Sequence, residues 1–347
     1  MESSDSVSEL NRAPVVTIEG LDRDFTCDKG DLILRAALRA GLGFPYECAT
    51  GSCGTCKYEL LVGHVEDTWP EAPGIRLRDR EHGRYLACQS KATGPIVIRV
   101  RLDERLRPPI PPRRSVATIS GRIYQAPGYS ELKLQISDEG AEFLPGQFIL
   151  IEFPGLTGAR AYSMSNQPNT DGVLQLHVKA KQEGIMSNLL VSESPIGTKL
   201  IVDGPYGHAF ARLEDSRPVV CIAGGSGLGP MLSVAGALAL TPLASQRSVD
   251  FFYGVRTPAE VCDLSDLRKQ AEAFGRWGLH VAVSDKPDNS WNGLVGMIDQ
   301  IVQVHLPMPW SNSLFYIAGP PPMVDAVVRV LLTCQVSHEQ LIFDRFY

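Results

Sequence analysis

The sequence predicts three domains in order: an α+β domain, an antiparallel β-barrel and a doubly wound α/β domain. Its 347 residues correspond to about two or three compact domains. A proline-rich segment at 104–114 is typical of an extended spacer between folded parts. After residue 218, short apolar runs alternate with helical patterns, which indicates a parallel sheet. We therefore expect domains at 1–103, 115–213 and 214–347, with a linker at 104–114.

The first domain is predicted from short elements. Residues 15–18 favour a strand, and a second short strand is expected around Phe25. Asp31 is placed to cap a helix at 32–40, and Gly41 to end it. The alternating residues 96–100 favour a closing strand.

The other two domains differ in their periodicity. Residues 117–120, 132–136, 148–153 and 174–178 read as strands separated by Gly and Pro turns, which is typical of a small antiparallel barrel. A weaker boundary falls near 212–218. The strands expected beyond it are 219–223, 250–253, 279–283 and 314–318.

Charge and hydropathy exclude several classes of protein. A net charge of −6 argues against a nucleic-acid-binding protein, which would normally present a basic face. Residues 218–246 carry no charge and are long enough to span a bilayer. However, four glycines and Pro230 divide that stretch into a strand, a turn and a helix, so we expect no membrane span. The first residues are polar and acidic, which favours a cytoplasmic protein.

Four of the eight cysteines carry the clearest motif. Cys48, Cys53 and Cys56 have the C-x4-C-x2-C spacing, with Cys88 as a distant fourth, and this spacing is typical of a plant-type [2Fe–2S] cluster. Structural zinc and packing thiols are the alternatives, but zinc sites favour C-x2-C pairs at both ends. The scattered cysteines are expected to be small buried hydrophobic residues: Cys27, Cys221, Cys262 and Cys334.

The first hundred residues resemble plant-type ferredoxins. The resemblance rests on Pro45-Tyr46-Glu47-Cys48 through Cys56 and on Leu86-Ala87-Cys88. It implies a ferredoxin-like β-grasp domain. It also implies that Cys48 and Cys53 hold one iron, and Cys56 and Cys88 the other.

The barrel region carries three short motifs that fit a flavin. Arg160-Ala161-Tyr162-Ser163 is expected at a strand-to-strand turn, where an arginine could neutralise a pyrophosphate. Alone this motif is weak, and a surface arginine beside a half-buried tyrosine is the alternative. Downstream, a strand ends at His177, Val178 and Lys179. A helix start suited to phosphate follows at Gly184, Met186 and Ser187, and another turn contains Gly204 and Pro205.

In that order, the motifs resemble the ferredoxin–NADP reductase superfamily. The resemblance implies FAD, with FMN as the alternative. It places Arg160 and Ser187 toward the pyrophosphate, and Tyr162, Ser163, His177 and Val178 around the isoalloxazine and ribityl groups. It also implies a C-terminal aromatic over the flavin, for which Phe346 is the candidate and Phe343 and Tyr347 are alternatives.

A glycine-rich turn after the first strand of the α/β region fits a dinucleotide, because glycines let the backbone approach a diphosphate. Its residues are Gly224, Gly225, Ser226, Gly227, Gly229 and Pro230. A turn that serves only packing is the alternative. In the resembled superfamily, the turn at Gly319 and Pro320 borders the nicotinamide, commonly after a cysteine; here Ala318 stands instead. Arg256 follows the second strand without a basic cluster, which favours NADH over NADPH.

The three domains in this order resemble the reductase components of bacterial multicomponent aromatic mono- and dioxygenases, including the benzoate dioxygenase type. That resemblance implies electron transfer from NADH through FAD and a [2Fe–2S] cluster to a partner terminal oxygenase. The chemistry belongs to the cofactors, so no catalytic side chain is assigned. A reductase for sugar deoxygenation and a non-enzymatic ferredoxin carrier are the alternatives.

Overall fold

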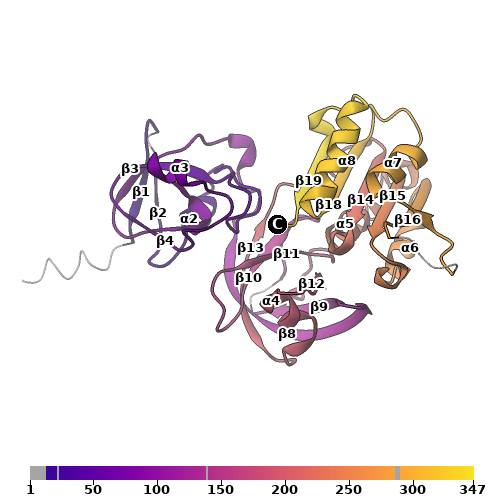
Figure 1. Cartoon of the computed structure of the whole chain (residues 1–347), viewed down its shortest axis with the longest axis horizontal. Coiled ribbons are helices and arrows are strands. Elements are labelled where there is room, and N and C mark those ends of the chain that lie inside the picture. The colour runs from indigo at the N-terminus through magenta and orange to yellow at the C-terminus, as the bar shows by residue number, and fades with distance from the viewer. Residues whose placement is uncertain (1–12, 22, 138–139, 286–289) are drawn as a thin grey trace, which may run out of the picture. The chain divides into compact units, whose positions relative to one another are not determined.

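The computed structural model describes residues 13–21, 23–137, 140–285 and 290–347. The chain divides into two compact units, Met1–Arg113 and Arg114–Tyr347, shown in Figure 1. Among the described residues, no helix is long and apolar enough to cross a membrane.

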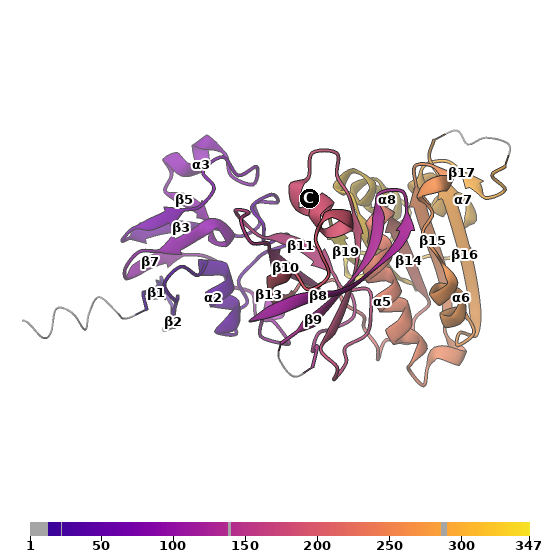
Figure 2. The ribbon, with the colours of Figure 1, turned by 90° about the horizontal axis from the view of Figure 1, so that it is seen from below.

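The N-terminal unit is a five-stranded mixed sheet in the order β2-β1-β7-β3-β5. Strand β1 pairs antiparallel with β2 and parallel with β7. Helix α2 (Ile33–Arg39) buries Ile33, Leu34 and Leu38, and Figure 2 shows it lying along one side of this sheet. This is the expected α+β domain. The strands are β1 (Val15–Ile18), β2 (Asp24–Thr26), β3 (Lys57–Val62), β5 (Arg84–Leu86) and β7 (Ile96–Arg99).

Helix α2 begins later and ends earlier than the sequence predicted. The Asp31 carboxylate accepts a hydrogen bond from the Leu32 amide at 2.9 Å, so Asp31 acts at the start of the helix as expected. Gly41 follows the helix with φ of +72°, a left-handed conformation that suits glycine.

Several elements around the cysteines were not predicted, because three to six residues hold too little periodicity. They are β3, β5, β4 (Val65–Asp67), β6 (Ser90–Ala92) and helix α3 (Leu77–Glu81). The segment 104–114 also differs from the expected spacer. Glu104–Leu106 forms a 3₁₀ turn and β8 begins at Arg113, because the Asp103 carboxylate caps the turn and the Arg107 side chain bonds to the Gly41 carbonyl.

The second unit begins with a six-stranded sheet in the order β11-β10-β13-β8-β9-β12. Its edges meet at an antiparallel bridge between Met164 and Leu176, so the sheet curls into a barrel around a buried core that includes Ile119, Leu134 and Ile151. The strands are β8 (Arg113–Ala126), β9 (Tyr129–Ile136), β10 (Phe148–Glu152), β11 (Arg160–Ser163), β12 (Val173–Lys179) and β13 (Lys199–Tyr206).

Two motifs expected in turns lie on strands instead. Arg160–Ser163 is β11, because it completes a ladder with β10 from Phe148–Ser163 to Ile151–Arg160. Gly204 and Pro205 lie within β13, and the turn starts after it at Gly207, whose φ is +99°.

The remaining residues form a parallel sheet in the order β17-β16-β15-β14-β18-β19. Helices α5 and α6 cover one face and α7 and α8 the other (Figures 1 and 2). The strand order reverses between β14 and β18, and in such sheets ligands bind at that switch point. The strands are β14 (Val219–Gly224), β15 (Ser248–Val255), β16 (Arg276–Val283), β17 (Leu294–Val295), β18 (Leu314–Gly319) and β19 (Leu341–Arg345); the helices are α5 (Leu228–Ala239), α6 (Ser265–Ala271), α7 (Ile298–His305) and α8 (Pro321–Thr333).

Candidate functional site

The four clustered cysteines form two close pairs in the N-terminal unit. Cys48 Sγ and Cys53 Sγ are 3.2 Å apart, and so are Cys56 Sγ and Cys88 Sγ. Three of the thiols are buried, and Cys53 is partly exposed. Two pairs of thiolates match the two irons of a [2Fe–2S] cluster, each iron taking two protein sulfurs.

Backbone amides are aimed at these sulfurs. The amides of Cys53 and Thr50 donate to Cys48 Sγ at 3.3 and 3.5 Å, and the Thr55 amide donates to Cys53 Sγ at 3.4 Å. The Cys48 thiol donates to the Cys53 sulfur and so lowers the pKa of Cys53. Donors of this kind stabilise thiolate sulfur and tune the potential of a cluster.

The loop that carries three of the cysteines, residues 48–56 (the cysteine loop), contains two glycines that its close packing requires. Gly51 and Gly54 have φ of +95° and +79°. A Cβ on Gly54 would lie 2.4 Å from the Gly74 carbonyl oxygen, and a Cβ on Gly74 would lie 2.6 Å from the Gly54 nitrogen. The Gly74 amide also donates to the Gly51 carbonyl at 2.9 Å. The segment at Gly74 therefore supports the cysteine loop directly.

The donor set fits two irons better than one zinc ion. Across the described residues, no three or more His, Cys, Asp or Glu side chains converge as a single ion requires, whereas structural zinc takes four ligands in one tetrahedron. The remaining cysteines behave as expected for packing residues. Cys27, Cys221 and Cys262 are buried and Cys334 is half-buried, and burial raises the pKa of Cys221 to about 12.

In the second unit, the β11 motif lies at the sheet edge next to β10. Arg160 is exposed, and within the described part of the chain its Nη1 donates to the neighbouring Ala159 carbonyl at 3.0 Å. Burial raises the pKa of Tyr162, so its ring occupies an apolar position. The Ser163 hydroxyl donates to Asp344 Oδ2 on β19 at 3.3 Å, which connects the barrel to the parallel sheet.

The end of β12 is buried and largely neutral. Burial lowers the pKa of His177 to about 4, and its Nε2 lies 3.8 Å from Glu131 Oε2. Val178 points into the barrel core. The Lys179 Nζ pairs with Glu260 at 3.2 Å and lies 4.7 Å from the centre of the Tyr129 ring.

The predicted helix start after β12 is the short helix α4 (Ile185–Asn188). The Ser187 hydroxyl donates to the Gly184 carbonyl at 2.9 Å and accepts from the Lys181 amide at 3.0 Å. Ser187 thus shapes this turn instead of presenting a free hydroxyl proton. Met186 packs in the barrel core, and a Cβ on Gly204 would lie 2.9 Å from Ile149 Cγ2.

The two predicted nicotinamide turns meet at the switch point between β14 and β18. A Cβ on Gly227 would lie 2.1 Å from the Ala318 carbonyl oxygen, and a Cβ on Gly224 would lie 2.7 Å from Met323 Sδ. A Cβ on Gly319 would lie 3.2 Å from Gly224 Cα, and its φ is +154°. Only glycine allows these two turns to approach so closely.

The same turn faces the barrel strands of the flavin motif. A Cβ on Gly229 would lie 3.3 Å from His177 Cβ, and a Cβ on Gly225 would lie 3.0 Å from the Tyr129 hydroxyl. Ser226 is half-buried and Pro230 is buried in α5. The structure therefore brings the predicted flavin strand β12 and the predicted dinucleotide turn into contact.

The C-terminal aromatics differ in their positions. The Phe346 amide donates to the Gly319 carbonyl at 2.9 Å, which places its backbone at the switch point. Phe343 lies within β19, where its ring is 4.3 Å from the Arg345 guanidinium, and Tyr347 is exposed. This geometry favours Phe346 over the alternatives.

Three residues near the site were not predicted: Tyr129, Glu260 and Asp344. Glu260 Oε2 accepts a hydrogen bond from the Arg256 amide at 3.3 Å, just after β15. An acidic residue after the second strand of such a sheet is a known ribose ligand, so Glu260 could have been found from its position. No local sequence pattern identifies Tyr129 or Asp344 as site residues, because the residues they contact are distant in the sequence.

Family models match most of the chain. A 2Fe-2S iron-sulfur cluster binding domain matches residues 16–93, an oxidoreductase FAD-binding domain matches 127–210, and an oxidoreductase NAD-binding domain matches 221–329. The predicted cofactors, a [2Fe–2S] cluster, FAD and NADH, are confirmed at the level of these domains.

Relatives cover the whole three-domain arrangement. The chain is 39% identical over 93% of its length to the ferredoxin–NAD(P)(+) reductase CarAd of Metapseudomonas resinovorans, covering 96% of that protein. It is 37% identical over 93% of its length to the ferredoxin–NAD(+) reductase component of the alkene monooxygenase system of Xanthobacter autotrophicus, covering 98% of it.

A solved structure agrees over nearly the full length. The ferredoxin reductase in carbazole 1,9a-dioxygenase superposes with a TM-score of 0.88 at 36% identity, covering 97% of this chain and 99% of the other. None of these three proteins is named as part of a sugar-deoxygenation system, so the comparison does not support that alternative. The chain belongs to the family of ferredoxin–NAD(P)(+) reductases, electron-transfer oxidoreductases with 2Fe–2S, FAD-binding and NAD-binding domains.

Proposed function

We propose that this chain oxidises NADH and delivers the electrons, through FAD and a [2Fe–2S] cluster, to a terminal oxygenase of an aromatic hydroxylation system. The contact between His177 on β12 and Gly229 at the start of α5 carries the proposal. Hydride transfer needs the flavin and the nicotinamide within a few ångströms, and this contact joins the elements that would hold each of them.

When bound, the cofactors would supply the redox chemistry: FAD would accept two electrons from NADH as a hydride and pass them on singly to a cluster that carries one electron at a time. The protein residues bind and orient them. We assign the cluster to Cys48, Cys53, Cys56 and Cys88. Gly224, Gly227 and Gly319 leave room for the dinucleotide backbone at the switch point, and Phe346 covers the nicotinamide entry.

His177 contributes a neutral surface beside the flavin strand. Because burial lowers its pKa to about 4, the imidazole carries no charge at neutral pH. A cationic side chain there would oppose the positive charge that the nicotinamide ring gains when NADH gives up its hydride. Ser163 and Asp344 hold the barrel and the parallel sheet together on the same side.

The partner, the domain limits and the location belong to the same proposal. The relatives are named as reductases of oxygenase systems, which supports an oxygenase as the electron acceptor. We assign domains to 1–103, 115–213 and 214–347, with 104–114 between them, and we propose a cytoplasmic protein.

An anaerobic titration with NADH tests the proposal. Visible absorbance of both flavin and cluster should bleach in the unmodified chain. Cys88→Ser should lose the cluster bands, because one iron loses a thiolate, while NADH still bleaches the flavin. Cys27→Ser is the matched control in the same unit: its buried thiol donates to the Asp31 carbonyl at 3.5 Å and is not among the proposed cluster ligands, so both chromophores should remain. A chain without flavin bands, or one that NADH leaves oxidised, would refute the function.

A further inference from the structure

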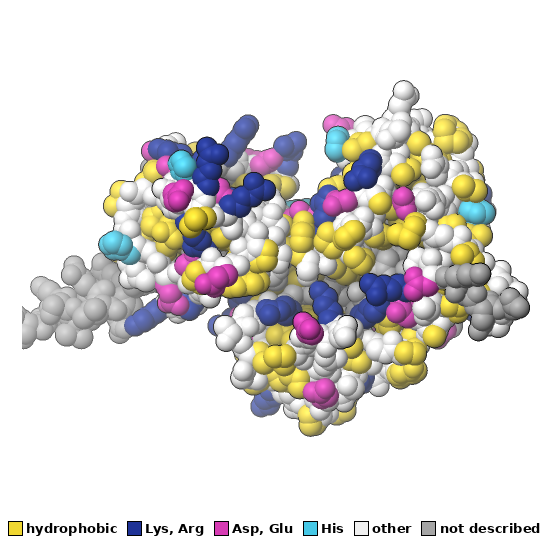
Figure 3. Space-filling model, viewed as in Figure 1, with side chains coloured by type: hydrophobic (Ala, Val, Ile, Leu, Met, Phe, Trp, Pro, Cys, Tyr) yellow, Lys and Arg dark blue, Asp and Glu magenta, His cyan; other side chains and the backbone are white. Residues whose placement is uncertain are grey.

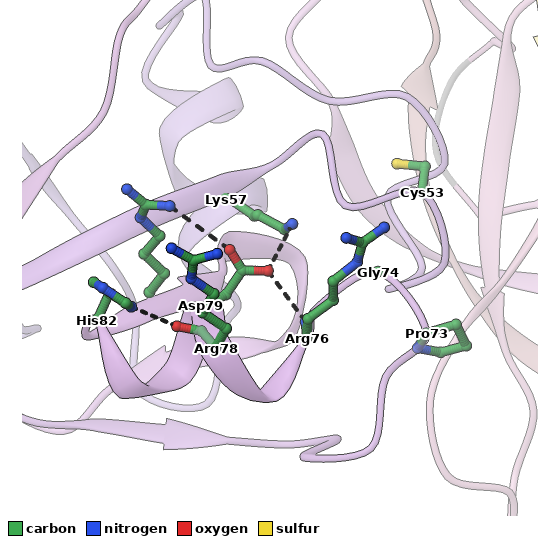
Figure 4. A pocket seen from close by; sticks show the side chains of 9 residues that line it. Cys53, Lys57, Pro73, Gly74, Arg76, Arg78, Asp79 and His82 are labelled. Carbon is green, nitrogen blue, oxygen red and sulfur yellow. Dashed lines mark hydrogen bonds and ion pairs between the residues drawn. The ribbon is translucent and has the colours of Figure 1, made fainter.

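The cysteine loop has one exposed side, and that side opens into a pocket lined mainly by basic side chains. Of the four proposed ligands, Cys53 alone is partly exposed. It lines a pocket of about 480 Å³ together with Lys57, Gly74, Asp79 and other residues. Figure 4 shows Cys53 at one end of this pocket and Asp79 near its middle. An electron that leaves the cluster by its most exposed ligand leaves here.

The pocket is strongly basic, although the chain carries a net charge of −6. Lys57, Arg76, Arg78 and Arg84 line it, against one acidic side chain, Asp79. The segment 76–84 contains four arginines, and Figure 3 shows basic side chains gathered over this part of the N-terminal unit. The local charge is therefore opposite to that of the whole molecule.

Asp79 pairs with two of the cations and leaves the side chains of Arg76 and Arg78 unpaired among the described residues. Its Oδ2 lies 2.9 Å from Lys57 Nζ and accepts from the Arg76 amide at 3.1 Å, and its Oδ1 lies 3.7 Å from Arg84 Nη1. The Asp79 side chain is only 16% exposed, whereas the Arg84 side chain is 50% exposed. Arg76 and Arg78 are exposed, and neither pairs with a carboxylate in the described part of the chain.

An apolar side chain stands between the two exposed arginines. Leu77, the first residue of α3, is 75% exposed. Arginine is enriched at protein–protein interfaces, so the two exposed arginines beside Leu77 suit a protein recognition site. The Gly74 amide bonds to the Gly51 carbonyl, so the wall of the pocket is fixed to the cysteine loop.

We infer that the Cys53 face, defined as Cys53, Lys57, Arg76, Leu77, Arg78 and Arg84, docks an acidic surface of the electron-accepting protein. Docking would place the acceptor beside the most exposed cluster ligand. One electron would pass, oxidising the cluster and reducing the acceptor, with no transfer of atoms. The inference rests on the proposed function, because it requires an acceptor at the cluster.

Charge reversal with two acceptors of opposite charge tests the inference. Arg76→Glu/Arg78→Glu should slow reduction of cytochrome b5, an acidic one-electron acceptor, by at least about tenfold at low ionic strength. The same variant should speed reduction of cytochrome c, a basic acceptor. Both differences should shrink in about 0.5 M salt, because salt screens exposed charges. Without NADH, the oxidised variant should bind cytochrome b5 at least about tenfold more weakly.

Arg23→Glu/Lys29→Glu is the matched control. Both residues are exposed and flank β2, at the edge of the five-stranded sheet opposite β5. This variant should leave both rates within about twofold of the unmodified chain, since isolated surface charges contribute little to docking far from them.

Four outcomes would overturn the inference: equal effects of the two double variants, equal slowing with both acceptors, no effect, or slower reduction of the cluster by NADH in Arg76→Glu/Arg78→Glu. The last would mean that the Cys53 face serves electron entry from the flavin unit. If NADH fails to reduce the cluster in the unmodified chain, the proposed function itself fails. If reduction is normal and charge reversal has no effect, only the docking face is wrong.

Discussion

At the scale of single residues, the burial of His177 in the candidate flavin site makes the stability of the second unit depend on pH. Its pKa falls from 6.5 to about 4 because of burial, so the unfolded chain takes up a proton first as pH falls. The contribution of His177 to the free energy of unfolding is therefore complete above pH about 6.5. It is lost as pH falls from about 6.5 toward 4.

We expect the free energy of unfolding of the second unit to drop by about 2 kcal/mol between pH 7 and pH 5 through His177. His177→Gln should remove that part of the pH dependence, measured by urea unfolding at both pH values. His338→Gln, at an exposed position, should keep the original dependence. An unchanged slope in His177→Gln would contradict the assignment of this buried neutral histidine.

Glu260 is the residue best placed to select NADH. It follows β15 and is held by Lys179 Nζ at 3.2 Å and by the Arg256 amide at 3.3 Å. A carboxylate there can accept from a ribose hydroxyl and repels a 2′-phosphate. Glu260→Gln removes the repulsion and releases Lys179.

The ratio of kcat/KM for NADH to that for NADPH should therefore fall by about tenfold in Glu260→Gln, equivalent to about 1.4 kcal/mol. Steady-state kinetics with both nucleotides and ferricyanide gives the ratio. Glu272→Gln is the control, because that carboxylate is exposed beyond α6. A ratio unchanged from the unmodified chain would exclude Glu260 from nucleotide selection.

At the scale of elements, the cysteine loop depends on the backbone beside it. Gly74→Ala would place a Cβ 2.6 Å from the Gly54 nitrogen and 2.7 Å from the Gly51 oxygen. We expect it to destabilise the N-terminal unit by about 2 kcal/mol or more and to lower its iron content. Gly94→Ala is the matched control, with no atom within 4 Å of the added Cβ. Equal iron content and melting temperature in the two variants would show that the loop does not need this contact.

The same scale shows what the sequence could and could not predict. The cysteine spacing and the glycine turns are local patterns, so the cluster loop and the β14 turn were recognisable. Contacts such as Ser163–Asp344 and Lys179–Glu260 join residues 181 and 81 positions apart, and no local pattern reports them. Strands β5 and β6 have three residues each, too few for a period of two to be recognised. The β11 motif read as a turn because four residues do not reveal a sheet edge.

At the scale of the whole molecule, the division after Arg113 separates the cluster from the two other cofactor sites. Residues 114–347 alone should reduce ferricyanide with NADH at a rate within about twofold of the full chain, and reduce cytochrome c at least about a hundredfold more slowly. Residues 1–113 alone should keep the cluster spectrum. Adding them back should restore only part of the rate, because a covalent link supplies an effective concentration near the millimolar range. Full cytochrome c activity in 114–347 would show that electrons leave from the flavin.

The close approach of the β14 and β18 turns has an evolutionary consequence. Gly227 and the Ala318 carbonyl leave no space for even one methyl group between them, and Gly224 packs on Gly319 from the other turn. A side chain gained at either turn must be matched by displacement of the other. The two turns, about ninety positions apart, should therefore change together during descent, and lineages that alter one without the other should be rare.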